Sequence, residues 1–445
     1  MHSNSQFQTQ PQSQQQQQQQ LQSQPAKKVP IAQKYKSLGF IAAGTYGRVF
    51  KAVRRDGDPT IEYAIKKFKP EKEGEASLQA GISQSACREI ALCRELSHVN
   101  VVNLEEVYVD PLDRSIYMVF EYAEHDLLQI LHHHSTLHGS SRQIPPYTIK
   151  SLLWQLVNGV AYLHANWVLH RDLKPANVLV TSTGVVKIGD LGLARIFQKP
   201  LKPLYDGDKV VVTIWYRAPE LLFSSKHYTP AVDMWAVGCI FAELLLLRPI
   251  FKGEEAKMDG KKTIPFQKDQ IAKIIDVLGP PTVEKWPTLS SMPDFNQLST
   301  LRMDKQESNL RNYCFQYPYS TTENGYLLLA ATLEYDPMKR LTADDALKHA
   351  YFVEDPTPGI VEGHGKYIFP NGNVYVGEFK DGQFHGNGTI HFTNGGRYDA
   401  SWKDGRVIDG KFTFKDGLVY EPENWGYCTP SDRRFYHEVL NGFNQ

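Results

Sequence analysis

The sequence lacks several features that would place the protein in a special class. Only five of its 445 residues are cysteines, and no two of them have the CxxC spacing of a zinc or redox site. An odd number of unpaired cysteines favours reduced thiols, so we expect a protein of the cell interior. Lysine and arginine together number 49, as do aspartate and glutamate, and this balance argues against direct nucleic-acid binding.

Long apolar runs are also missing. The most apolar stretch, residues 236–247, is short and contains Glu243, whereas a transmembrane helix needs about 20 apolar residues. The N-terminus lacks the basic patch and apolar core of a secretory signal. Instead, the first 25 residues contain 13 glutamines and almost nothing apolar. We therefore predict a disordered glutamine-rich tail that ends near residue 34.

The central part of the chain changes from strand-like to helical patterns. Runs rich in β-branched and aromatic residues come first, as at 61–65 and 116–120. Helical patterns follow, as at 149–164 and 232–247. This order predicts an α+β domain with a small β-rich lobe followed by a larger α-helical lobe.

The C-terminal part has a different composition. Of the 32 glycines, 15 fall in residues 359–445. Tyr375, Tyr398 and Tyr420 are spaced by 23 and 22 residues, which indicates a repeat. Five Asx-Gly pairs, which suit tight hairpin turns, punctuate the segment: Asn371-Gly372, Asp381-Gly382, Asn394-Gly395, Asp404-Gly405 and Asp416-Gly417. The sequence thus predicts a tail at 1–34, a mixed domain at 35–352, a linker at 353–360 and an all-β hairpin array at 361–445.

A glycine-containing turn lies near the start of the mixed domain. Small residues there would let backbone N–H groups approach phosphate oxygens, although a plain hairpin turn explains the segment equally well. Lys66 lies 19 residues beyond Gly47 in a strand that would turn its side chain toward the turn; a solvated lysine is the alternative. Glu89, on a helical stretch, is a candidate ion-pair partner of Lys66. The candidate ATP contacts in the turn are Ile41, Ala42, Ala43, Gly44, Thr45, Tyr46, Gly47, Arg48 and Val49.

An ordered set of three later motifs carries the chemistry. His170-Arg171-Asp172-Leu173-Lys174-Pro175-Ala176-Asn177 is followed by Asp190-Leu191-Gly192 and then by Ala218-Pro219-Glu220. This is the set of a protein kinase, since phosphoryl transfer needs a carboxylate near the acceptor hydroxyl and oxygen ligands for magnesium. Asp172 is the predicted base, Asn177 and Asp190 are predicted Mg²⁺ ligands, and Lys174 is the lysine of serine/threonine kinases. ATP is the expected co-substrate.

Two positions depart from the usual kinase pattern. Ala42 stands where the glycine loop normally has its first glycine, and Leu191 replaces the usual phenylalanine of the magnesium-binding motif. The extra methyl group of Ala42 should stiffen the loop slightly. Neither change removes a base, a ligand or the lysine, so we expect an active enzyme.

Finer features resemble the cyclin-dependent branch of the kinases. The run 213–220 resembles that branch, and 81–89 resembles the cyclin-binding helix of its fungal Mediator-associated member. The resemblance extends over 35–352 and includes Asp126, which it places among the ATP contacts. It implies a nuclear serine/threonine kinase that acts on transcription factors and on RNA polymerase II through its C-terminal domain. The implied partners are a cyclin C-like cyclin and two large Mediator kinase-module subunits.

The same resemblance assigns roles to an acid and three arginines. Asp208 lies 12 residues before Glu220, where related kinases carry a threonine that must be phosphorylated. Arg88, Arg171 and Arg195 match the arginines that clamp that phosphate. A carboxylate supplies one negative charge instead of nearly two, so it would engage only part of this cluster. The alternative is that Asp208 is an exposed loop acid.

Val212 and Arg217 resemble the arrangement that selects a proline after the phosphorylated residue. Proline suits such a site because it has no N–H group to leave unpaired. We therefore expect Ser-Pro and Thr-Pro substrates.

Residues 361–445 resemble a small MORN-repeat protein. The similar segments are 375–379, 381–382, 385–388 and 427–442. Residues 363–367 resemble the second half of a repeat whose first half is missing. The junction near residue 359 therefore resembles a fusion between a kinase and a repeat module. Repeats of this kind are structural or interaction modules. They leave open a second hypothesis, in which the chain is a scaffold and catalysis is secondary.

Overall fold

The computed structural model describes residues 29–43, 47–68, 84–110, 115–137, 143–197, 213–225, 229–256, 265–301, 307–315, 322–354, 363–368, 373–380, 383–403 and 405–421. The chain divides into two compact units, residues 1–86 with 104–122, and residues 87–103 with 123–445. None of the described helices has the length and hydropathy that a membrane span needs.

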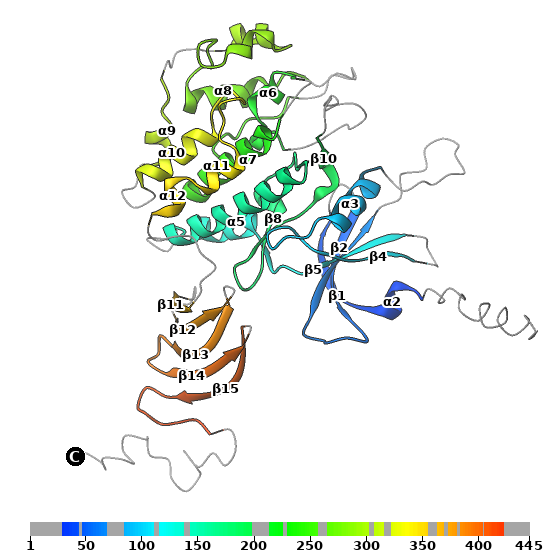
Figure 1. The fold of residues 1–445 in the computed structure, drawn as a ribbon, viewed down its shortest axis with the longest axis vertical. Helices are drawn as coiled ribbons and strands as arrows, with labels where there is room; N and C mark the ends of the chain where they lie inside the picture. Colours follow the sequence, from blue (N-terminus) through cyan, green and yellow to red (C-terminus); the bar gives the residue numbers. More distant parts are fainter. Residues whose placement is uncertain are drawn as a thin grey trace, which may run out of the picture. The chain divides into compact units, whose positions relative to one another are not determined.

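The first unit is built on a five-stranded antiparallel sheet (Figure 1). Alternating apolar residues bury one face of the sheet around Tyr35, Ala52, Ile65 and Val119. The strands, in their order across the sheet, are β1 (Tyr35–Ala43), β2 (Gly47–Arg54), β3 (Glu62–Phe68), β5 (Ile116–Glu121) and β4 (Leu104–Val109).

A short helix, α2 (Ile31–Lys34), precedes this sheet. The sequence assigned these residues to the disordered tail. In the structure the Ile31 N–H donates to Asp110 at 2.8 Å, and Lys34 Nζ lies 2.6 Å from a carboxylate oxygen of Glu106. The placement of these residues therefore depends on β4 and the residue that follows it, 72 and 79 positions away, and no local pattern predicts it.

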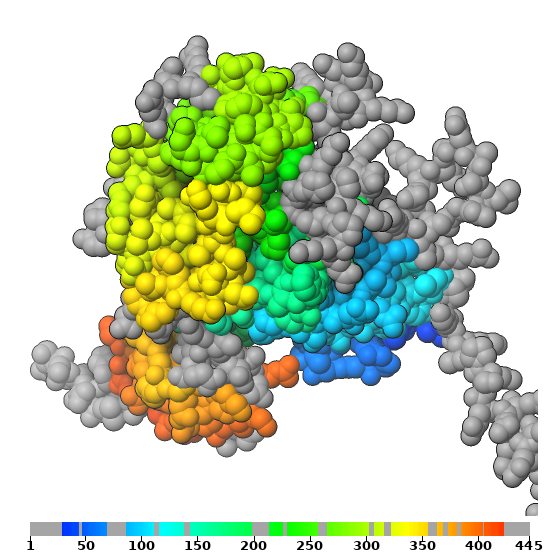
Figure 2. Space-filling model, turned by 45° about the horizontal axis from the view of Figure 1, so that its top comes forward, coloured from blue at the N-terminus to red at the C-terminus, as the bar shows by residue number. Residues whose placement is uncertain are grey.

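The second unit contains the helical lobe, whose closely packed body is green to yellow in Figure 2. Its centre is the apolar helix α7 (Ala231–Leu246), in which both Trp235 and the charged Asp233 are buried. The helices are α3 (Gln84–Glu95), α4 (Leu127–Thr136), α5 (Pro146–Ala165), α6 (Pro219–Leu222), α7 (Ala231–Leu246), α8 (Lys268–Leu278), α9 (Leu310–Cys314), α10 (Glu323–Thr332), α11 (Ala343–Leu347) and α12 (Ala350–Val353). The short strands are β6 (His125–Asp126), β7 (Val168–Leu169), β8 (Val178–Val180), β9 (Val186–Ile188) and β10 (Arg195–Ile196).

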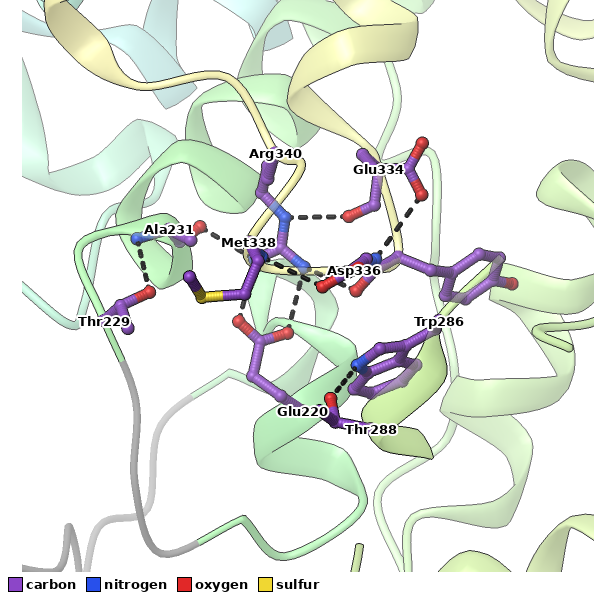
Figure 3. Close-up of polar contacts among 10 residues, drawn as sticks. Glu220, Thr229, Ala231, Trp286, Thr288, Glu334, Asp336, Met338 and Arg340 are labelled. Carbon is purple, nitrogen blue, oxygen red and sulfur yellow. Dashed lines mark hydrogen bonds and ion pairs between the residues drawn. The ribbon is translucent and has the colours of Figure 1, made fainter. Parts of the chain in front are cut away.

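One buried arginine ties the end of this lobe to its middle (Figure 3). Arg340 makes a bidentate ion pair with Glu220, at 2.8 and 2.9 Å, and its side chain is fully buried. The guanidinium also donates to the carbonyl oxygens of Ala231, Glu334 and Tyr335. These contacts use all five of its N–H groups, so the buried charge is fully hydrogen-bonded.

The helical lobe extends into the segment that the sequence assigned to a linker. Helix α12 ends at Val353, and Glu354 accepts at its carbonyl oxygen from Lys150 Nζ at 2.9 Å. The carboxylate of Glu354 accepts from Asn324 at 2.7 Å. Lys150 is buried, so Glu354 belongs to the lobe because it supplies an acceptor to a buried ammonium group.

The repeat segment forms an antiparallel sheet with its strands in chain order (orange in Figure 1). Its small core contains Tyr375, Phe379, Ala400 and Trp402. Gly395, Gly405 and Gly417 have positive φ angles, which confirms the hairpin-turn prediction at these three glycines. The strands are β11 (Gly363–Ile368), β12 (Val374–Lys380), β13 (Gln383–His391), β14 (Arg397–Lys403) and β15 (Arg406–Thr413).

Candidate active site

The predicted base is held between two neighbours of its own motif. Asp172 is 6% exposed, and its Oδ2 accepts from Lys174 Nζ at 2.7 Å and from Asn177 Nδ2 at 3.1 Å. Asn177 Nδ2 also donates to the Asp172 carbonyl oxygen at 2.7 Å. Asp172 Oδ1 is buried and has no hydrogen-bond donor among the described residues. One carboxylate oxygen is therefore anchored by two donors, and no donor among the described residues competes for the other.

A histidine fixes the backbone on which this carboxylate stands. His170 Nε2 lies 2.9 Å from the Gly189 carbonyl oxygen, and its Nδ1 lies 3.2 Å from the Asp172 N–H. A carbonyl oxygen accepts only, and a backbone N–H donates only, so the ring carries its proton on Nε2. His170 is completely buried, and it joins the segment before the base to the segment before Asp190.

Asp233 in α7 is the deeper anchor of the same segment. Its two carboxylate oxygens accept from the backbone N–H groups of His170 and Arg171 at 2.9 and 2.8 Å. Arg171 has a φ of 71°, an unfavourable value for a side-chain-bearing residue. The two hydrogen bonds hold this strained turn in place. Burial alone would raise the pKa of the Asp233 carboxyl group. The hydrogen bond with His164 Nε2, which lies 3.0 Å away, and the backbone donors outweigh burial, so the pKa is lowered.

The two predicted metal ligands are brought together by the hairpin β8–β9. Asn177 immediately precedes β8, Asp190 follows β9 by two residues, and the Gly189 N–H donates to the Asn177 carbonyl oxygen at 2.9 Å. Asp190 has a φ of 57° and begins the short 3₁₀ helix Leu191–Leu193. Because the Asn177 amide nitrogen donates to Asp172, its amide oxygen is the atom left for a ligand. Together with the Asp190 carboxylate, it is the hard-oxygen donor set that fits Mg²⁺.

Three of the predicted nucleotide contacts of the first unit, Ala42, Val49 and Lys66, share one sheet face. Val49 lies opposite both Ala42 on β1 and Lys66 on β3, so the three side chains point to the same side. Gly47 meets the backbone of β3 so closely that a Cβ atom there would lie 2.3 Å from the Lys67 carbonyl oxygen. Ile41 and Ala43 are exposed on β1, as is Arg48 on β2. Gly44, Thr45 and Tyr46 lie outside the described residues.

Asp126, the remaining predicted nucleotide contact, caps helix α4. Its Oδ1 accepts from the Gln129 N–H at 2.8 Å, and burial raises the pKa of this carboxyl group. Glu89 is buried on α3, but it belongs to the second unit and Lys66 to the first. The Lys66–Glu89 ion pair therefore stays a prediction.

Two of the three predicted clamp arginines are placed by contacts near the segment that follows Asp190. Arg88 Nη1 donates to the Gly192 carbonyl oxygen at 3.2 Å. Arg195 on β10 pairs with Leu169 on β7, two residues before Arg171. Arg217 follows the short 3₁₀ helix 214–216. Asp208 and Val212 lie outside the described residues.

Sequence reasoning missed two buried acids of α7. Asp233 anchors the catalytic segment, and Glu243 accepts from the Tyr216 hydroxyl at 2.7 Å beside the predicted proline pocket. Both acids are about 1–2% exposed. Their signal was present, because an acid inside an otherwise apolar helix must have a buried partner. The identity of each partner, however, is a matter of tertiary structure.

Two family models match the chain. The protein kinase domain matches residues 35–352, and the MORN repeat matches residues 360–374 and 375–397. The chain is 61% identical to the serine/threonine-protein kinase SSN3 of Yarrowia lipolytica over 329 residues, which cover 74% of this chain and 80% of that protein. It is 58% identical to the serine/threonine-protein kinase ssn3 of Aspergillus terreus over 341 residues, which cover 73% and 77%.

Proposed function

Because the chain belongs to the protein kinase family, we propose that it transfers the γ-phosphate of ATP to serine or threonine in Ser-Pro and Thr-Pro sequences. The observation that carries this proposal is the arrangement around Asp172. One of its oxygens is fixed by Lys174 and Asn177, and the other is buried and has no donor in the part of the chain that the structure describes. An acceptor hydroxyl at that oxygen would find a base that is already oriented.

The other residues of the site have complementary tasks. Lys174 carries a positive charge next to the base, where a phosphate oxygen passes during transfer. Asn177 and Asp190 would hold Mg²⁺, which supplies charge neutralisation to the phosphates when it is bound. Lys66, on the same sheet face as Val49, would hold the α- and β-phosphates, and the loop residues from Ile41 to Val49 would cover them.

The proposed setting is the Mediator kinase module. The similarity to kinases named SSN3 supports a nuclear, cyclin-dependent enzyme with a cyclin C-like partner. Its proposed substrates are RNA polymerase II, at the C-terminal domain, and transcription factors. Since Asp208 is already acidic, we propose that Arg88, Arg171 and Arg195 need no loop phosphate and take the rest of their negative charge from partners.

The test is a radiolabel assay of the cyclin-bound full chain with Asp172→Asn. This variant keeps the size of the side chain but removes the proton acceptor, so kcat should fall by about a hundredfold or more. Asp269 is an acid at the start of α8, and Asp269→Asn is the matched control, which should leave kcat unchanged. If Asp172→Asn bound cyclin and kept full turnover, the base assignment would be wrong and the scaffold hypothesis would gain support.

A further inference from the structure

A lysine of β2 lies over the tyrosine at which the chain leaves the first unit. Lys51 Nζ is 4.3 Å from the centroid of the Tyr122 ring. The same ammonium group makes an ion pair with Glu62 of β3 at 2.8 Å. The chain passes from the first unit to the second directly after Tyr122. A cation therefore contacts the ring of the residue at this crossing point.

The sheet brings Lys51 and Tyr122 together although their strands are not neighbours. Strand β3 lies between β2 and β5, so the two side chains bridge two strand spacings, roughly 10 Å (Figure 1). Ala64 on β3 lies opposite Lys51, and Phe120, two residues before Tyr122, lies opposite Ala64. Because Ala64 has only a methyl group as its side chain, the lysine can cross β3 to reach the tyrosine ring.

This contact lies on the sheet face that carries predicted nucleotide contacts. Val49 is two residues before Lys51 and lies directly opposite Lys66. Side chains two residues apart on a strand point to the same face, and so do directly opposite residues. Lys51 therefore shares its face with Val49 and with Lys66, the proposed ligand of the α- and β-phosphates.

Residues 122–126, here called the connecting segment, join this face to the predicted nucleotide contact of the second unit. That contact, Asp126, pairs with β8 through its backbone and caps helix α4. At the other end, β5 ends at Glu121, so Tyr122 lies one residue beyond the strand ladder. Lys51 thus contacts the connecting segment at the end that the ladder does not reach.

The lysine keeps its charge, and its contacts act more on position than on stability. The hydrogen bond to Glu62 raises the pKa of Lys51, although burial opposes the shift. The side chains of Lys51 and Glu62 are 29% and 31% exposed, so water screens their ion pair and little stability is gained from it. A cation over an aromatic face nevertheless favours one orientation of the ring. The ion pair with Glu62 in turn limits where the lysine can point.

We propose that Lys51 positions the connecting segment for nucleotide binding, and that it acts through the ring of Tyr122. This inference rests on the proposed function, because it concerns the affinity of the same site for ATP. With the lysine in place, the segment is already ordered before the nucleotide arrives, so binding pays less conformational entropy. Lys51 is a positioning residue and takes no part in phosphoryl transfer.

The first test is an equilibrium titration of the full chain with ADP, which needs neither turnover nor a protein substrate. Lys51→Met removes the cation and should weaken ADP binding by about threefold to fivefold. Lys51→Arg keeps a cation over the ring and should bind ADP like the wild type. Lys67→Met is the matched control and should have no effect, because Lys67 Nζ lies 5.2 Å from the Tyr117 ring on the opposite sheet face. An equal loss in Lys51→Met and Lys51→Arg would contradict the proposal.

The same titration separates this inference from the proposed function. A wild-type chain that bound no ADP would overturn the proposed function, and this inference with it. Binding by the wild type with unchanged affinity in Lys51→Met would overturn the positioning role alone. In the radiolabel assay, the loss should appear as a higher KM for ATP, with kcat at saturating ATP retained. A lower kcat at an unchanged KM would contradict the proposal.

The second test asks whether the lysine acts through the tyrosine. Tyr122→Leu alone should weaken ADP binding at least as much as Lys51→Met, because each change removes the same contact. Adding Lys51→Met to Tyr122→Leu should then cause no further loss. If the two losses multiplied, Lys51 would contact the nucleotide itself and the positioning role would be overturned. Thermal denaturation of each variant checks that the sheet is intact, and recovery of affinity in Lys51→Arg excludes misfolding as the cause of the loss.

Discussion

The helical lobe and the repeat sheet bury their aromatic residues in different ways. Trp235 in α7 is in contact with Tyr335, whose ring centroid is 6.3 Å away although 100 positions separate them in the sequence. Tyr375 in β12 stacks at 3.8 Å on Phe384, nine positions later, and meets Trp402 edge-on at 5.6 Å. The lobe thus depends on distant contacts, while the sheet is stabilised by neighbouring hairpins.

The largest effect should come from a distant contact of the lobe. Arg340→Met removes one partner of the buried ion pair with Glu220 and leaves the carboxylate without its bidentate donor. The free energy of unfolding of the lobe should fall by about 3–5 kcal/mol. Hydrogen exchange of the full chain should show the loss in α7 and α10 and no change in β12–β14.

Two results would limit this interpretation. Replacement of both partners, Arg340→Met with Glu220→Leu, should be less damaging than the single change because no unpaired charge remains. If exchange in the repeat sheet rose as much as in α7, the two regions would unfold together and the comparison would fail.

A smaller and local effect is expected in the repeat sheet. Tyr375→Leu removes the stack on Phe384 and the hydroxyl donation to the Glu378 carbonyl oxygen at 2.9 Å. We expect a loss of about 1–3 kcal/mol, typical of a changed core side chain. Exchange should rise in β12–β14 only, with kinase activity unchanged. Ile408→Ala, which is 67% exposed on the same sheet, is the control and should have little effect.

The third prediction concerns pH and the lobe alone. Burial raises the pKa of Glu243 from 4.5 to about 7, although the hydrogen bond from Tyr216 opposes the shift. The folded state therefore keeps a proton that the unfolded chain releases near pH 4.5. This group makes the free energy of unfolding fall as the pH rises from about 4.5 to 7.

Chemical denaturation at several pH values checks this slope. Glu243→Gln cannot titrate, so it should flatten the pH dependence in that window and keep the acceptor for Tyr216. The exposed Glu255→Gln is the control and should preserve the wild-type slope. An unchanged slope in Glu243→Gln would show that Glu243 is ionised in the folded lobe throughout this range.

The smallest effect should follow complete removal of the repeat sheet. A chain that ends at Thr357 keeps Glu354 and should retain cyclin-dependent kinase activity. A chain that ends at Val353 lacks the acceptors of the buried Lys150 and of Asn324, so it should be less stable. Turnover and thermal denaturation of the two chains, measured side by side, test this boundary. Loss of turnover in the soluble, cyclin-bound longer chain would make the repeats part of the enzyme.

The sequence predicted those parts of the site that are contiguous motifs. Asp172, Lys174 and Asn177 lie within one turn-rich segment, and the structure shows them within hydrogen-bond distance of each other. The convergence of Asn177 and Asp190 also follows from a short hairpin. By contrast, nothing near Asp172 in the sequence identifies Asp233 as the anchor of its backbone, because 61 residues separate them.

The sequence by itself determined the kinase motifs, the α+β order of elements and the repeat period, because each is encoded by neighbouring residues or by a regular spacing. Only the tertiary structure decided that Ile31–Lys34 is helical, that Glu354 completes the lobe, and that Asp233 and Glu243 have buried partners. The physical reason is that a buried polar group needs a partner, and packing of distant segments alone selects which group that partner is.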